Sequence, residues 1–180
     1  MNDTTLGSAR TTYWQVNGFG TDGGDSLDWV PLKLWKLTIK IPNTEGRRQA
    51  VRFHDLHHVL TGYSTTWTGE AEIGAWELAS GCLNWPAATV LNLSVLAIGL
   101  VIAPVRVARA WARGRQSRNL YREPGIEHLL PRTVESMREA LHLEQPVRVR
   151  ARDVAGMLLA AVAAFALLLA PLAAIAALVL

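Results

Sequence analysis

Side chains that commonly bind metals are concentrated in one short stretch of the sequence. Three of the five histidines lie within residues 54–58, which read His-Asp-Leu-His-His, and a Gly69-Glu70 pair follows. Residues four apart share one face of a helix, so His54 and His58 would direct two imidazoles to one point. Two histidines with a carboxylate form a site that suits zinc, iron(II) or manganese and leaves positions open to water or substrate. The stretch therefore predicts a divalent metal site.

Other residues near this pair have less certain roles from spacing alone. Asp55 is one position round the helix from His54, so it could bind the metal directly or orient an imidazole. His57 lies off the shared face, and we assign it a structural role. A surface or helix-end location of His54 and His58 stays open as an alternative, because pairs at this spacing also arise by chance. The single cysteine, Cys82, excludes a cysteine-based zinc site.

Two helices must position these residues. Asn43 or Thr44 can cap a helix that starts near Glu45 and runs to about Thr61, and Gly62 can end it in the left-handed conformation. A second helix is expected from about residue 68 to near residue 81. The connection is so short that the two helices are expected to pack antiparallel as an αα-hairpin.

The expected hairpin brings carboxylates to the histidines. His58 and Glu70 each lie about one turn from the bend, so they should face each other. Glu77, two turns further along, should lie level with His54 and orient its imidazole. Glu72 points elsewhere and is expected to be solvated.

Two apolar segments suggest a membrane. Residues 86–105 carry no charge and could span a bilayer, or form an apolar helix packed in the domain or against lipid, with Thr89 and Asn92 on a face that could line a substrate trough. Residues Val154 to Leu180 also carry no charge and predict a transmembrane helix, in which Pro171 is tolerable as a kink. We favour a single span formed by this second segment.

Charge is distributed unevenly around these segments. Residues 1–85 contain seven Lys/Arg against nine Asp/Glu, whereas residues 106–152 contain eleven Arg against five Glu. A basic block beside apolar segments is typical of the cytoplasmic membrane surface. It lacks the interleaved aromatic residues of a nucleic-acid site, so no nucleic-acid partner is expected.

The sequence thus predicts an all-α fold with three regions. Residues 1–42 form a Gly-rich and amphipathic lead-in, in which residues 29–41 could be a short strand or a helix. Residues 43–152 form a helical domain built on the αα-hairpin with its metal site. Residues 153–180 form the transmembrane helix.

The metal-site pattern resembles a known family signature. His54-Asp55-x-x-His58, then eleven residues, then Glu70 preceded by Gly69, is similar to the signature of the coenzyme Q (ubiquinone) biosynthesis protein 4 family. The resemblance covers roughly residues 43–143, although only the signature is specific. The apolar C-terminal run is not expected of a typical member and suggests a divergent bacterial-type branch.

This resemblance implies a membrane-associated helical protein of quinone synthesis. It implies a divalent metal, zinc first with iron or manganese as alternatives, at His54, Asp55, His58 and Glu70, and these four would also be the catalytic residues. Members are associated with replacing the carboxyl group of a prenylated aromatic ring by hydroxyl, and with organising other quinone-synthesis enzymes around a lipid-bound intermediate. The expected partners are a prenylated quinone precursor or another lipid, and the expected location is the bacterial inner membrane with the helical domain in the cytoplasm.

Two other functions fit parts of the pattern. Residues 54–58 also fit the His-x-x-His-His box of membrane di-iron fatty-acid hydroxylases, but such sites draw about eight histidines from several boxes, and this chain has five. A non-catalytic membrane-tethered scaffold that binds lipid, with a structural metal, is the second alternative.

Overall fold

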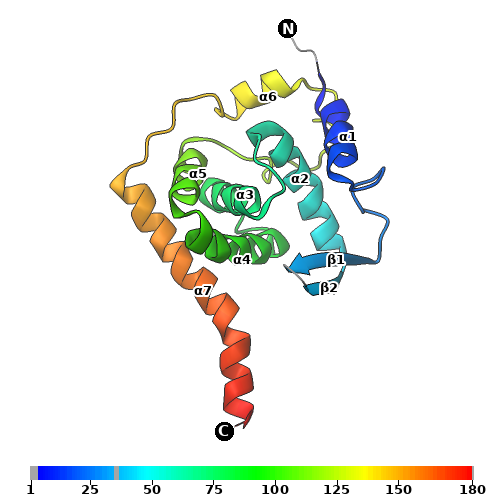
Figure 1. Cartoon of the computed structure of the whole chain (residues 1–180). Helices are drawn as coiled ribbons and strands as arrows, with labels where there is room; N and C mark the ends of the chain where they lie inside the picture. The colour runs from blue at the N-terminus through cyan, green and yellow to red at the C-terminus, as the bar shows by residue number, and fades with distance from the viewer. Residues whose placement is uncertain (1–3, 35–36, 180) are drawn as a thin grey trace.

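A computed structural model describes residues 4–34 and 37–179, and this part of the chain is mostly helical with little sheet (Figure 1). The predicted helical class is therefore confirmed at this coarse level, and one two-stranded antiparallel sheet departs from it. In chain order the elements are α1 (Leu6–Asn17), β1 (Trp29–Leu34), β2 (Leu37–Pro42), α2 (Glu45–Thr61), α3 (Trp67–Ser80), α4 (Pro86–Ile102), α5 (Pro104–Gln116), α6 (Val134–Ala140) and α7 (Ala151–Val179).

The two helices that carry the candidate metal ligands begin and end at their capping residues. The Thr44 side chain accepts a hydrogen bond from the Arg47 amide at the start of α2, and Gly62 ends this helix at a φ of 76°. Thr66 caps α3 in the same way, and Gly81 ends it in the left-handed region. Both helices therefore match the prediction to within about one residue, because local capping chemistry decides their ends.

Helix α3 lies at the centre of the domain and packs most extensively against α4 and α5 (Figure 1). Small residues allow this close approach: a Cβ at Gly99 of α4 would overlap Ala71, and a Cβ at Gly114 of α5 would overlap the Trp76 backbone. The contact between α3 and α2 is much smaller. The close antiparallel αα-hairpin predicted for these two helices is therefore not confirmed.

The N-terminal region is more ordered than its composition suggests. Helix α1 was not predicted, yet Thr5 caps it, Gly18 ends it, and its Leu6 and Trp14 are buried in the domain. Residues 29–34 and 37–41, for which a strand and a helix were both possible, form strands of a β-hairpin in which Trp29 pairs with Pro42. The lead-in thus contributes a helix to the same hydrophobic core as α2.

One face of the apolar helix α4 packs on the domain, while its Val90, Val101 and Ile102 are exposed. Asn92 is buried and donates to Glu77 of α3, while the Thr89 hydroxyl donates to the Cys82 carbonyl. The expectation that these two side chains line a substrate trough is therefore wrong, because this face of α4 is the one that packs on α3.

Helix α7 is long and apolar enough to cross a membrane over Ala151–Ala170, and 22% of this window is buried. One side packs against α4 and α5 through Met157 and Ala164, whereas Leu159 and Val162 are more than 70% exposed. The predicted C-terminal membrane helix is thus supported by length and composition. The side chains from Pro171 onward, and Leu180, lie outside the described residues.

Candidate metal centre

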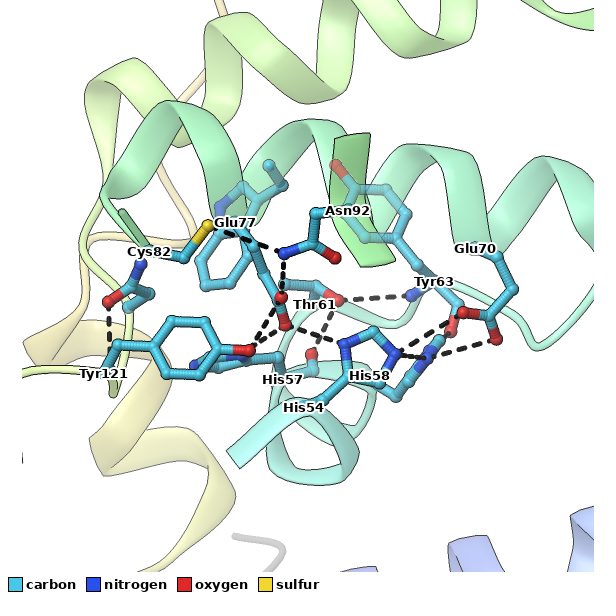
Figure 2. Close-up of polar contacts among 12 residues, drawn as sticks. His54, His57, His58, Thr61, Tyr63, Glu70, Glu77, Cys82, Asn92 and Tyr121 are labelled. Carbon is cyan, nitrogen blue, oxygen red and sulfur yellow. Dashed lines mark hydrogen bonds and ion pairs between the residues drawn. The ribbon is translucent and has the colours of Figure 1, made fainter. Parts of the chain in front are cut away.

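Three of the four predicted ligands meet between the C-terminal half of α2 and the first turn of α3 (Figure 2). The Nε2 atoms of His54 and His58 are 3.1 Å apart. Glu70 Oε2 lies 3.4 Å from His54 Nε2, and Glu70 Oε1 lies 3.5 Å from His58 Nε2. One donor atom from each of the three residues lies within 4.8 Å of the others. Donor atoms bound at about 2.0–2.2 Å to one tetrahedral metal lie about 3.3–3.5 Å from each other. The spacing of these three groups therefore fits a shared metal ion.

Hydrogen bonds fix the tautomers of the two imidazoles. His58 Nδ1 lies 2.9 Å from the Tyr63 carbonyl oxygen, and His54 Nδ1 lies 2.9 Å from Glu77 Oε1. Both oxygens can only accept, so each Nδ1 carries a hydrogen and donates it. In the neutral rings the two Nε2 atoms then face each other with lone pairs. A cation, either a proton or a metal, is needed between them.

Glu77 anchors this arrangement from the interior of the protein. Its side chain is fully buried. His54 and His57 each donate from Nδ1 to Oε1, while Asn92 and the Tyr121 hydroxyl donate to Oε2 (Figure 2). A buried carboxylate is tolerated only when its lone pairs are used in this way. The predicted position of Glu77 beside His54 is thus confirmed.

His57 is a structural residue, as the sequence indicated. Its Nε2 accepts a hydrogen bond from the Leu120 amide at 3.0 Å, and its Nδ1 donates to Glu77 at 2.7 Å. Burial lowers its pKa below 6.5, so the ring is neutral. Both nitrogens are therefore committed to the protein, which removes the third histidine that a His-x-x-His-His di-iron box would use.

The charges of the centre are strongly coupled. Burial alone would raise the pKa of Glu70, but its contacts with His54 and His58 lower it to about 2. Burial would lower the pKa of His54, but the charges of Glu77 and Glu70 together raise it well above 6.5. The site therefore stabilises a positive charge at the point where the three donor groups meet.

Asp55 is not brought into this group. Its Oδ2 accepts a hydrogen bond of 2.7 Å from the Trp14 indole of α1, and burial raises its pKa. A residue one position after His54 is rotated by about 100° round the helix, which turns its carboxylate toward α1. The prediction that Asp55 shares the metal-binding point is corrected accordingly. Glu72 is also corrected: it points away as expected, but it pairs with Arg106 at 2.7 Å instead of being solvated.

Local packing holds the two helices in position around the centre. A Cβ at Gly69 would overlap the Ser64 carbonyl oxygen, so glycine lets the turn pass close to α3 directly before Glu70. At the other helix, Arg113 donates to the Thr61 carbonyl and Arg138 donates to the Leu60 carbonyl. These guanidinium groups satisfy the free carbonyls at the end of α2. Part of the basic block assigned to a membrane surface therefore has this structural role.

Helix α1 supplies an aromatic neighbour that the sequence did not reveal. The Tyr13 ring stacks on the His58 imidazole, with 5.3 Å between ring centroids, and Phe19 contacts the edge of Tyr13. The centre remains partly open, because 22% of the His54 side chain and 30% of the Glu70 side chain are exposed. Tyr13 comes from more than forty positions earlier in the chain, so no local spacing could have indicated it.

Comparison of the chain with protein-family models, with curated proteins and with solved structures finds no match. The geometry of the centre is therefore the basis for the functional interpretation.

Proposed function

We propose that this protein is a membrane-associated metalloprotein whose divalent metal is held by His54, His58 and Glu70. One observation carries the proposal: two imidazole Nε2 atoms lie 3.1 Å apart with both Nδ1 atoms committed as donors, and a carboxylate completes the triangle. A set of two nitrogens and one oxygen with open positions suits zinc first, and iron(II) or manganese as alternatives.

We further propose that the substrate is a prenylated aromatic precursor of a quinone. The proposal rests on the resemblance of the site pattern to the coenzyme Q biosynthesis protein 4 family, and the reaction would be oxidative replacement of the ring carboxyl group by hydroxyl. The bound metal would supply a Lewis acid for the ring carboxylate or for oxygen. Glu77 would keep the Nδ1 proton of His54 in place, and Glu70 would hold the metal from the partly exposed side of the centre.

The location we propose is the bacterial inner membrane, with α7 as a single span and the helical domain in the cytoplasm. Because α7 packs on α4 and α5 within this span, α4 would lie in or against the membrane face. Exposed apolar side chains along α7 support this, as do Val101 and Ile102 at the end of α4. Arg148, Arg150 and Arg152 stand directly before or at the start of α7, where a cytoplasmic flank would carry them. A reporter fused ahead of residue 1 should remain cytoplasmic, and an extracytoplasmic reporter would reverse the topology.

A non-catalytic scaffold that binds lipid and organises other quinone-synthesis enzymes is the second candidate. It is favoured by the position of the three ligands, because they join the end of α2 to the start of α3 where these helices otherwise share few contacts. A metal at this junction could be structural.

Metal analysis of the purified full-length protein tests the centre. The parent protein should hold about one metal per chain, whereas His58→Ala and Glu70→Gln should each lose most of it. Asp55→Asn is the matched control, because its neighbour Trp14 can still donate to the amide oxygen and the ligand set is unchanged. A folded His58→Ala variant with full metal content would overturn the assignment, and metal loss in Asp55→Asn would restore that residue as a ligand.

Catalysis and scaffolding are separated by a second measurement. The metal-loaded protein is incubated with a polyprenylated carboxy-quinol precursor, and both binding and product are followed. Conversion that requires Glu70 supports the enzyme. Tight binding without conversion supports the scaffold.

A further inference from the structure

A separate cavity of about 300 Å³ lies between α1, the Gly-rich loop after α1, α2 and residues 126–130. None of His54, His58 and Glu70 lines it. Four arginines do line it, one from α1 and three from the first half of α2: Arg10, Arg47, Arg48 and Arg52. Such a density of guanidinium groups around one cavity requires counter-charges or a ligand.

Two of these arginines hold the Gly-rich loop. Arg52 forms two hydrogen bonds, of 3.1 and 2.8 Å, with the Asp25 carboxylate. Arg48 donates from Nε to the Asp25 carbonyl and from Nη2 to the Leu27 carbonyl. Their donors are therefore largely used within the protein.

The other two arginines have free donors. In the described part of the chain, the Nη atoms of Arg10 and Nη2 of Arg47 make no hydrogen bond, and the Nε atoms of both residues are occluded and also lack a partner. Arg10 lies over the Trp14 ring at 4.5 Å, and Arg47 donates from Nη1 to Asn43. Neither forms an ion pair with a carboxylate among the residues at 4–34 and 37–179. Burial without such a pair lowers the pKa of both groups.

The acidic side chains around the cavity form no ion pair with Arg10 or Arg47 in the described part of the chain, although the charge of Asp55 acts on both arginines. The Asp22 carboxylate accepts from the Gly24 and Ser26 amides of its own loop. Asp25 is paired with Arg52, and Asp55 accepts from Trp14. Glu127 is exposed at the rim. Two half-buried guanidinium groups therefore line the cavity with Nη donors left over.

We propose that this cavity is a binding site for a small phosphate-type oxoanion, held by Arg10 and Arg47. The planar guanidinium fork binds tetrahedral and planar oxoanions through paired N–H donors. The cavity volume exceeds that of inorganic phosphate alone, so a small phosphate ester also fits. The site is independent of the metal centre and of the function proposed for it.

The test is calorimetric titration of inorganic phosphate into the full-length protein in detergent, with acetate as a singly charged comparison. Phosphate should bind saturably and more tightly than acetate. Arg10→Gln and Arg47→Gln should each weaken phosphate binding about tenfold or more, because each removes charge-assisted hydrogen bonds. Arg115→Gln is the matched control, since Arg115 is exposed on α5 and does not line the cavity.

Several outcomes would overturn the proposal. They are absence of saturable phosphate binding to the parent protein, acetate binding as tight as phosphate binding, and equal weakening by Arg115→Gln. If a glutamine variant does not fold, Arg47→Lys keeps the charge but not the fork and should still bind phosphate more weakly than the parent. Metal content should stay unchanged in these variants, which separates failure of this site from failure of the metal centre.

Discussion

Glu77→Gln is the substitution that tests most directly how the centre is held. Glutamine keeps the shape of the side chain but removes the charge and replaces one acceptor oxygen by an NH₂ group. In the native protein His54 and His57 donate to one carboxylate oxygen, and Asn92 and Tyr121 donate to the other. In either amide orientation, two donors would therefore face an N–H group.

The expected loss of stability follows from this count. A hydrogen bond to a charged group contributes about 1.5–3 kcal/mol, and a buried group left unpaired costs a similar amount. Two lost partners of Glu77 should therefore lower the free energy of unfolding by about 3–5 kcal/mol. That is a large share of the about 5–15 kcal/mol typical of a folded domain. Metal affinity should also fall by about 10–100-fold, since His54 loses the acceptor that fixes its tautomer.

Chemical denaturation followed by tryptophan fluorescence measures the first effect, and competition with a chelator measures the second. The free energies are compared in the metal-free state, so that metal binding does not contribute. Glu144→Gln is the matched control, because this glutamate is exposed and lies outside the network. A Glu77→Gln protein within about 1 kcal/mol of the parent, with unchanged metal affinity, would refute the role assigned to the carboxylate.

Two further results are expected. Gly69→Ala should destabilise the protein and weaken metal binding, because its Cβ overlaps the Ser64 carbonyl beside Glu70. Gly46→Ala is the control: its Cβ has open space, so in unfolding measurements it should be neutral or stabilising by about 0.5–1 kcal/mol. Equal effects of the two substitutions on stability would contradict this prediction. Metal-free protein should be most stable near about pH 6.5. As pH falls, the unfolded chain binds protons that His57, with its lowered pKa, and then Glu70, with a pKa of about 2, do not bind. As pH rises, stability is lost through the raised pKa of His54. Unfolding at a series of pH values checks this, and a stability unchanged between about pH 3 and 6 would contradict it.

Local features of the centre were predictable because neighbouring residues decide them. Thr44 and Gly62 determine the ends of α2, and the four-residue spacing places His54 and His58 on one face. The position of Glu77 near His54 was predicted from the expected hairpin of two consecutive helices, and the contact is present although the close packing of that hairpin is not confirmed. In each case the relevant interactions lie within one helix or between two consecutive helices.

Long-range packing decided the rest. Asp55 was predicted as a possible ligand, but its carboxylate accepts a hydrogen bond from Trp14 of α1, 41 positions away in the chain. Helix α1 itself was missed, since its polar sequence gives no apolar stripe and only burial of Leu6 and Trp14 fixes it in place.

The sequence by itself thus determined which residues could bind a metal and which segments are apolar enough for a membrane. The tertiary structure decided that three of the four predicted ligands converge. It also decided that the buried Glu77 carboxylate accepts a hydrogen bond from one of them, His54, and that Asn92 donates to the same carboxylate instead of lining a trough. The physical reason is that helix ends and the spacing of residues on one face depend on local chemistry. Which further side chains pair with them, as Trp14 does with Asp55 and Tyr121 with Glu77, depends on how segments distant in the chain pack.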